Sequence, residues 1–112
     1  MSIRELKEHL QAGEAINLLT LKEHMPVGET MALAKTKSME IIRMVLPGGK
    51  KIAEHKVSGE ITVQCLKGEV DFGVEGKKQN LKVGDLIFLN GGQKHDLLAI
   101  SDSVLLVTIL LN

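Results

Sequence analysis

"GKKIAEHKVSGEITVQCLKG", residues 49–68, has a glycine at each end and alternating hydrophobic and polar side chains in its second half. A two-residue period is typical of a half-buried β-strand, because successive side chains point to opposite sides of the sheet. One set of alternate positions is mostly apolar and is predicted to face inward: His55, Val57, Ile61, Val63 and Cys65. The other set is polar and is predicted to face outward: Glu60, Thr62 and Gln64.

Short β-type runs continue on both sides of this stretch, and Gly, Pro, Asn or Asp separates most of them. They are residues 16–21, 39–46, 69–74, 85–89, 95–100 and 104–111. Glu75-Gly76 is a predicted two-residue hairpin loop, since Gly supplies the positive φ that such turns need. Many short strands in 112 residues predict an all-β sandwich or small barrel, with its sheets spanning about 16–111.

The N-terminal segment is predicted to begin with one short helix. Ser2 and Glu5 have the spacing of a capping box, and Gly13 is a plausible end. We expect one domain over residues 1–112, in which the helix and a cover segment occupy about 1–30 and the barrel core about 31–112.

The composition argues against several classes of function. The 14 Lys and Arg balance the 14 Asp and Glu, and Trp and Tyr are absent, so neither a basic stripe nor the usual stacking platforms are available to bind nucleic acid. The first ten residues carry charges throughout and predict no signal peptide, and no apolar run is long enough for a membrane helix. A single cysteine, Cys65, suits a reducing compartment. A soluble cytoplasmic protein is therefore expected.

The last run, Val104 to Leu111, is apolar on both faces except at Thr108. One face can line a barrel, while the other needs cover from the N-terminal segment or from a second subunit. A homodimer that buries the outer face of this region or the N-terminal strand is expected, since two-fold dimers are the commonest assemblies.

Residues 49–68 resemble the first motif of the cupin superfamily, also called the RmlC-like jelly roll. Gly49, His55 and Gly68 stand at the spacing of that motif. A second stretch, "GDLIFLNGGQKH" from Gly84 to His95, resembles the second motif. The resemblance covers roughly residues 41–111, and it implies a jelly-roll barrel, or double-stranded β-helix, as the fold.

The second motif also contains two departures from the family pattern. Gly92 and His95 keep their places, whereas Asn90 replaces a proline and Ala99 replaces the final asparagine.

Metal-dependent cupins hold a divalent ion with three histidines and one glutamate, and the resemblance makes His55 and His95 the first and third of these histidines. The second histidine position is Val57 and the glutamate position is Ile61, neither of which can donate a ligand atom. The metal motif is therefore degenerate. We expect no tightly bound cofactor, and at most a weakly held Fe, Mn, Ni or Zn.

An alternative register would change the ligand set. A β-bulge at Ser58-Gly59 would reverse the faces of the following strand, since Gly permits such a bulge. Glu60 and Gln64 would then join His55 and His95 as candidate metal ligands, with Thr62 also in the pocket.

The favoured hypothesis is a stand-alone protein that binds a small molecule inside the barrel. The expected ligand-binding residues are His55, His95, Val57, Ile61 and Val63. The alternative is a metal-dependent enzyme, dioxygenase- or isomerase-like, that uses the two histidines with a non-standard third ligand. A metal-free enzyme with a histidine general base, and a purely structural module, are further hypotheses.

Overall fold

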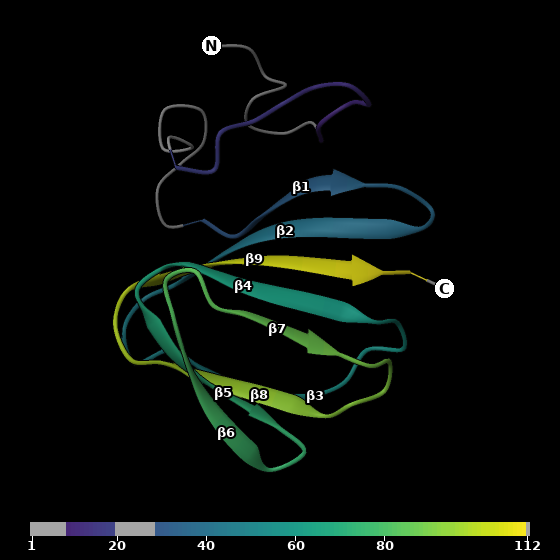
Figure 1. Cartoon of the computed structure of the whole chain (residues 1–112). Coiled ribbons are helices and arrows are strands. Elements are labelled where there is room, and N and C mark those ends of the chain that lie inside the picture. Colours follow the sequence, from purple (N-terminus) through teal and green to yellow (C-terminus); the bar gives the residue numbers. More distant parts are fainter. Residues whose placement is uncertain (1–8, 20–28, 112) are drawn as a thin grey trace.

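The computed structural model describes residues 9–19 and 29–111, and antiparallel strands form the body of the described chain. The strands are β1 (Met31–Lys35), β2 (Met39–Leu46), β3 (Lys51–His55), β4 (Ile61–Lys67), β5 (Glu69–Val74), β6 (Lys77–Lys82), β7 (Leu86–Leu89), β8 (His95–Ala99) and β9 (Ser103–Leu110). Two sheets face each other, with the strand orders β1-β2-β9-β4-β7 and β3-β8-β5-β6 (Figure 1). The predicted all-β fold is confirmed.

The strand pairing is nested, as in a jelly roll. β5 pairs with β6, β4 with β7, β3 with β8, and β2 with β9. Each pair encloses the preceding one, so the chain resembles a long hairpin rolled into two sheets. The innermost hairpin turns at Glu75 and Gly76, whose φ values are 50° and 82°, as predicted for a primed two-residue turn. This nesting brings the two sequence motifs together, because β3 and β4 of the first motif pair with β8 and β7 of the second, respectively.

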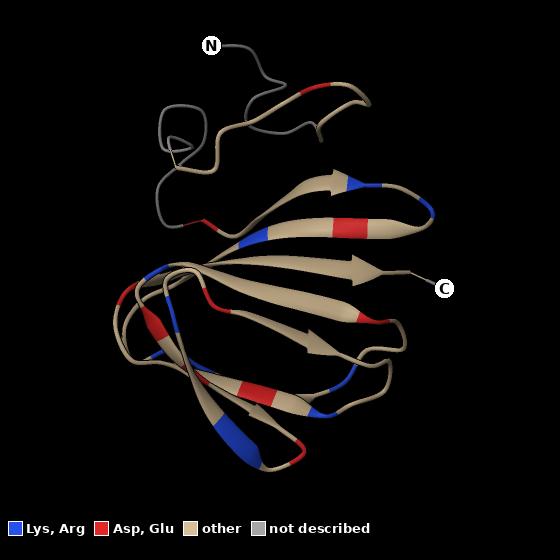
Figure 2. Ribbon diagram, viewed as in Figure 1, with Lys and Arg blue, Asp and Glu red and all other residues tan. Residues whose placement is uncertain are grey.

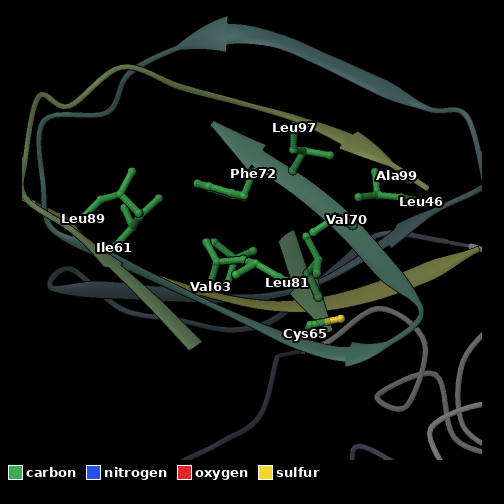
Figure 3. Packing of buried hydrophobic residues seen from close by; sticks show 12 residues of the cluster. Leu46, Ile61, Val63, Cys65, Val70, Phe72, Leu81, Leu89, Leu97 and Ala99 are labelled. Carbon is green, nitrogen blue, oxygen red and sulfur yellow. The ribbon is translucent and has the colours of Figure 1, made fainter. Parts of the chain in front are cut away.

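The core lies between the two sheets, and Figure 3 shows its side chains converging from both layers. On β4, Ile61, Val63 and Cys65 are buried, whereas Thr62 and Gln64 on the other face are half-buried. The predicted register of this strand is therefore the observed one. The buried core consists of Leu46, Ile61, Val63, Cys65, Val70, Phe72, Leu81, Leu89, Leu97, Ala99, Leu105 and Val107.

The N-terminal segment differs from its prediction where it is described. Most of the expected helix falls on residues 1–8, outside the described residues, and the chain from His9 to Gly13 is not helical. No helix in the described ranges is long and apolar enough to cross a membrane.

The expected strand at 16–21 is also wrong in its described part. At Ile16–Leu19 the side chain of Asn17 accepts a hydrogen bond from the Leu19 N–H at 2.8 Å and turns the backbone. Residues 20 and 21 lie outside the described residues. Ile16 and Leu18 nevertheless pack against Leu33 of β1, so the segment covers the sheet without joining it.

Cys65 is fully buried and its thiol is expected to be chemically silent in the folded protein. Burial raises the pKa of the Cys65 thiol, more than its backbone contact with Lys67 lowers it. Folding thus favours the neutral thiol. That contribution to stability is complete below the pKa of the unfolded thiol and is lost as the pH rises through the higher folded value.

We expect Cys65 to react with a disulfide reagent at least about 100-fold more slowly in the native protein than after unfolding in guanidinium chloride, because the thiolate is scarce and enclosed. Absorbance of the released thiolate at mildly alkaline pH measures both rates. Equal rates would mean that the β4 register is not the one described.

Candidate functional site

A cavity of about 80 Å³ lies between the sheets, towards the end where β3 stops and β8 begins. Its walls come from β2, β3, β4, β5, β8 and β9, with Val57 from the loop after β3. The lining residues are Ile42, Met44, Ile52, His55, Val57, Ile61, Val63, Phe72, His95, Leu97, Leu105, Val107 and Ile109. Two of them are histidines and the others are hydrophobic, so an enclosed ligand meets polar side-chain atoms at these two imidazoles.

The two histidines form a facing pair. His55 ends β3 and His95 begins β8, and the ladder pairs them directly. Residues directly opposite in an antiparallel ladder project from the same face, so the rings meet, with centroids 4.3 Å apart and planes at 60°. His95 is buried and stacks on Phe72, with ring centroids 5.9 Å apart and planes 7° from parallel. His55 is exposed, and the pair therefore connects the cavity to its mouth.

Hydrogen bonds to the backbone fix which nitrogen of each ring is available. The Nδ1 atoms of His55 and His95 each lie 3.0 Å from a backbone oxygen, that of Ala53 and that of Gln93 respectively. A carbonyl oxygen can only accept, so each Nδ1 carries a proton and donates it. In the neutral rings both Nε2 atoms are then acceptors. The site offers two lone pairs, on atoms that no protein donor occupies in the described contacts.

The loops that carry this site are held against each other by close backbone contacts. Gly92 donates its N–H to the Val57 oxygen at 2.8 Å. A Cβ atom at Gly59 would collide with the Leu110 carbonyl oxygen, and one at Gly91 would collide with the Ser58 oxygen. The glycine at position 59 therefore permits a close approach of two backbones, and not the strand reversal that the alternative register requires.

All five residues predicted to bind a ligand line the cavity: His55, His95, Val57, Ile61 and Val63. Glu60 and Gln64 do not. Glu60 is exposed, and Gln64 lies on the other face of β4 between Leu106 and Leu86. The reversed register, with these two side chains in the pocket, is not the register of the structure.

Sequence reasoning missed most of the apolar lining. Phe72 is the most consequential omission, because its ring stacks on His95. Alternate positions of β9 also contribute, and the nested pairing that places them beside β4 has no short sequence motif of its own.

The donor set of a metal-dependent cupin does not fit this cavity. Within the described residues, no cluster of three or more His, Cys, Asp or Glu side chains could hold a metal ion. Val57 and Ile61 are the side chains beside the imidazoles where the family places a histidine and a glutamate. Water on a dication here would face methyl groups instead of hydrogen-bond partners.

Comparison with known proteins places this architecture in a family. Residues 42–110 match the family described as the cupin domain. A cupin superfamily protein from Desulfitobacterium hafniense has a similar structure, with a TM-score of 0.77 and 20% identity over 93% of this chain and 96% of that one.

Two matches, one by sequence and one by structure, come from Thermotoga maritima. One, named an oxalate-binding protein, is 36% identical over 62 residues, a match that spans 54% of this chain and about half, 51%, of that protein. A crystal structure of a predicted oxalate decarboxylase from the same organism matches with a TM-score of 0.64 and 26% identity, over 73% of this chain and 77% of that one. Since the family match spans more than half of the sequence and the fold agrees, the chain belongs to the cupin domain family.

Proposed function

We propose that this cupin binds a small molecule inside its barrel, held by the Nε2 atoms of His55 and His95, without a tightly bound metal. The observation that carries the proposal is the facing histidine pair in an otherwise apolar cavity. Since Nδ1 of each ring is used by the backbone, Nε2 is the nitrogen left for a ligand. Polar groups converging in an apolar pocket are typical of a ligand site.

The cavity volume limits the ligand to a few non-hydrogen atoms. About 80 Å³ has room for several waters or one small organic molecule. The hydrophobic walls favour a compact ligand with its polar atoms gathered at one end, near the imidazoles.

The histidine tautomers limit the ligand further. Two neutral Nε2 acceptors repel a fully ionised carboxylate, whose oxygens are also acceptors. A carboxylic acid binds only if it brings a proton, or if one imidazole has taken one up. The oxalate-binding relative makes small carboxylic acids the first class to test.

The free Cys65 agrees with a reducing compartment, and we propose the cytoplasm as the location of this protein.

Titration of the protein with oxalate and with butyrate, followed by NMR of the imidazole resonances, tests the proposal. We expect saturable binding of at least one of these acids. Its affinity should fall as the pH rises, since one proton accompanies each bound anion.

Substitution of either histidine identifies the site. His95→Ala and His55→Ala should each weaken binding at least about tenfold, by removing a hydrogen bond to a charged or acidic group. His9→Ala is the matched control, because His9 does not line the cavity. Unchanged binding in both site variants would place the ligand elsewhere.

Metal content separates this proposal from the enzyme hypothesis. Protein purified without added metal should carry well below one equivalent of Fe, Mn, Ni or Zn, and mild chelation should remove what is present, because two neutral donors hold such ions weakly. Elemental analysis after dialysis against a chelator measures this. A retained equivalent would contradict the proposal, and His95→Ala and His55→Ala would then show whether the two imidazoles hold the ion.

A further inference from the structure

The cavity between the sheets is polar at one end only. The facing histidine pair lies where β3 ends, and the short loop after β3 leads directly to Ile61 at the start of β4. Val63 follows two residues farther along β4, and Cys65, two residues farther again, pairs with Leu105. Ile61, Val63 and Leu105 all line the cavity. The cavity therefore begins at the histidine pair and extends along β4 into the core.

Beyond the histidine pair, the side chains that line the cavity are all hydrophobic. None of the lining residues is Lys, Arg, Asp or Glu, and Figure 2 shows β9, which contributes three of them, without a charged segment. Val63 and Phe72 project from opposite layers (Figure 3) and are 2% and 1% exposed. A polar group of a ligand at this depth would therefore meet hydrocarbon.

The backbone of the lining strands supplies no partner either. β2, β4, β5, β8 and β9 each have a neighbouring strand on both sides, so ladder hydrogen bonds occupy their N–H and C=O groups. β3 is an edge strand, and its groups that are not bonded to β8 point along the sheet, away from the cavity. A ligand thus satisfies one polar end, at the imidazoles, and no second one among the described lining residues.

The cavity volume and the single polar end together define a class of ligand. At about 10–15 Å³ for each water-sized atom, 80 Å³ holds roughly five to eight non-hydrogen atoms. A carboxyl group at the imidazoles leaves space for a short hydrocarbon tail, and the walls offer nothing to a second charged group.

We propose that this cupin selects short-chain aliphatic monocarboxylic acids of about three to six carbon atoms and rejects dicarboxylic acids of the same size. The carboxyl group lies at the histidine pair, and the alkyl tail extends past Val63 towards Leu105. This selectivity rests on the proposed function, because it belongs to the same cavity and the same histidine pair. Its cause is the hydrophobic wall: a buried carboxylate without partners is costly, whereas each buried methylene group is favourable.

Oxalate illustrates the selection, since it has the same number of non-hydrogen atoms as butyrate. If one carboxylate of oxalate meets the imidazoles, the other lies either among the side chains around Val63 or outside the mouth in water. The first position leaves a charge without a partner, and the second forfeits contact with the walls. Oxalate therefore gains nothing over acetate at this site.

NMR titrations of the wild-type protein at one fixed pH test the selection. We expect the affinity to rise about fourfold for each methylene group from acetate to butyrate, since each adds buried hydrocarbon. Oxalate should bind no more tightly than acetate. The hydroxypropionate that has a hydroxyl group in place of the terminal methyl of butyrate should bind at least about tenfold more weakly than butyrate. It keeps the size and the single charge of butyrate and changes only the polarity of the tail.

A hydroxyl group placed in the wall locates the tail. Val63→Thr keeps the shape of the side chain and adds a donor inside the cavity, so the preference for butyrate over this hydroxypropionate should fall at least about fivefold. Val70→Thr is the matched control, because Val70 is also buried but does not line the cavity. Circular dichroism checks that both variants are folded. An equal change of preference in the two variants would contradict the orientation of the tail.

The outcomes separate this selectivity from the function on which it rests. Oxalate binding as tight as that of butyrate, and lost in His95→Ala, would overturn the monocarboxylate preference and leave the ligand site standing. Binding that neither His55→Ala nor His95→Ala weakens would overturn the site itself, and the selectivity with it. The absence of any binding to the wild-type chain would also overturn both.

Discussion

The pairing of β9 with both β2 and β4 is the constraint on which the rest of the fold depends. β9 pairs along its whole length with β2, and six of its residues pair with β4, so it is the central strand of the five-stranded sheet. One face sends Leu105 and Val107 into the core, and the other carries Leu106 and Thr108 outward. A strand that is apolar on both faces requires cover on both sides. The cavity wall and the uncovered outer face are thus two results of one hydrophobic strand.

Much of the fold could be predicted from sequence because its signals are local. The alternation of apolar and polar residues predicted which side chains of β4 face the core, and Glu75-Gly76 predicted the innermost turn. The same reasoning wrongly predicted a strand at Ile16–Leu19. The apolar residues of this segment pack on Leu33, while the Asn17 side chain turns the backbone. A hydrophobic run by itself does not distinguish a strand in the sheet from a segment lying across it.

The site was predictable in its polar residues and not in its shape. His55 and His95 occupy motif positions. The alternation of side chains along β4 predicted that Ile61 faces the cavity and that Glu60 faces outward. The stacking of Phe72 on His95 depends on a contact between strands distant in sequence. The backbone bonds that fix the histidine tautomers are local, since each ring reaches the oxygen two residues before it, but no residue pattern marks them in advance. The burial of Arg43 is a further example: position 43 is an ordinary outward position on β2, and it is enclosed only because of how the sheet is covered.

The edge strands of the two sheets differ in how well their side chains prevent pairing with another chain, and this difference affects aggregation. Exposed lysines line the edge strand β6, which makes it a poor template for another strand. An edge strand of the other sheet, β7, has the sequence Leu-Ile-Phe-Leu and no charge. Its protection rests on its length of four residues, which leaves few backbone groups open to another strand. A newly synthesised chain is therefore exposed at β7 to strand pairing with other chains, which leads to aggregation. Its solubility in a crowded cell depends on how quickly folding makes that edge inaccessible.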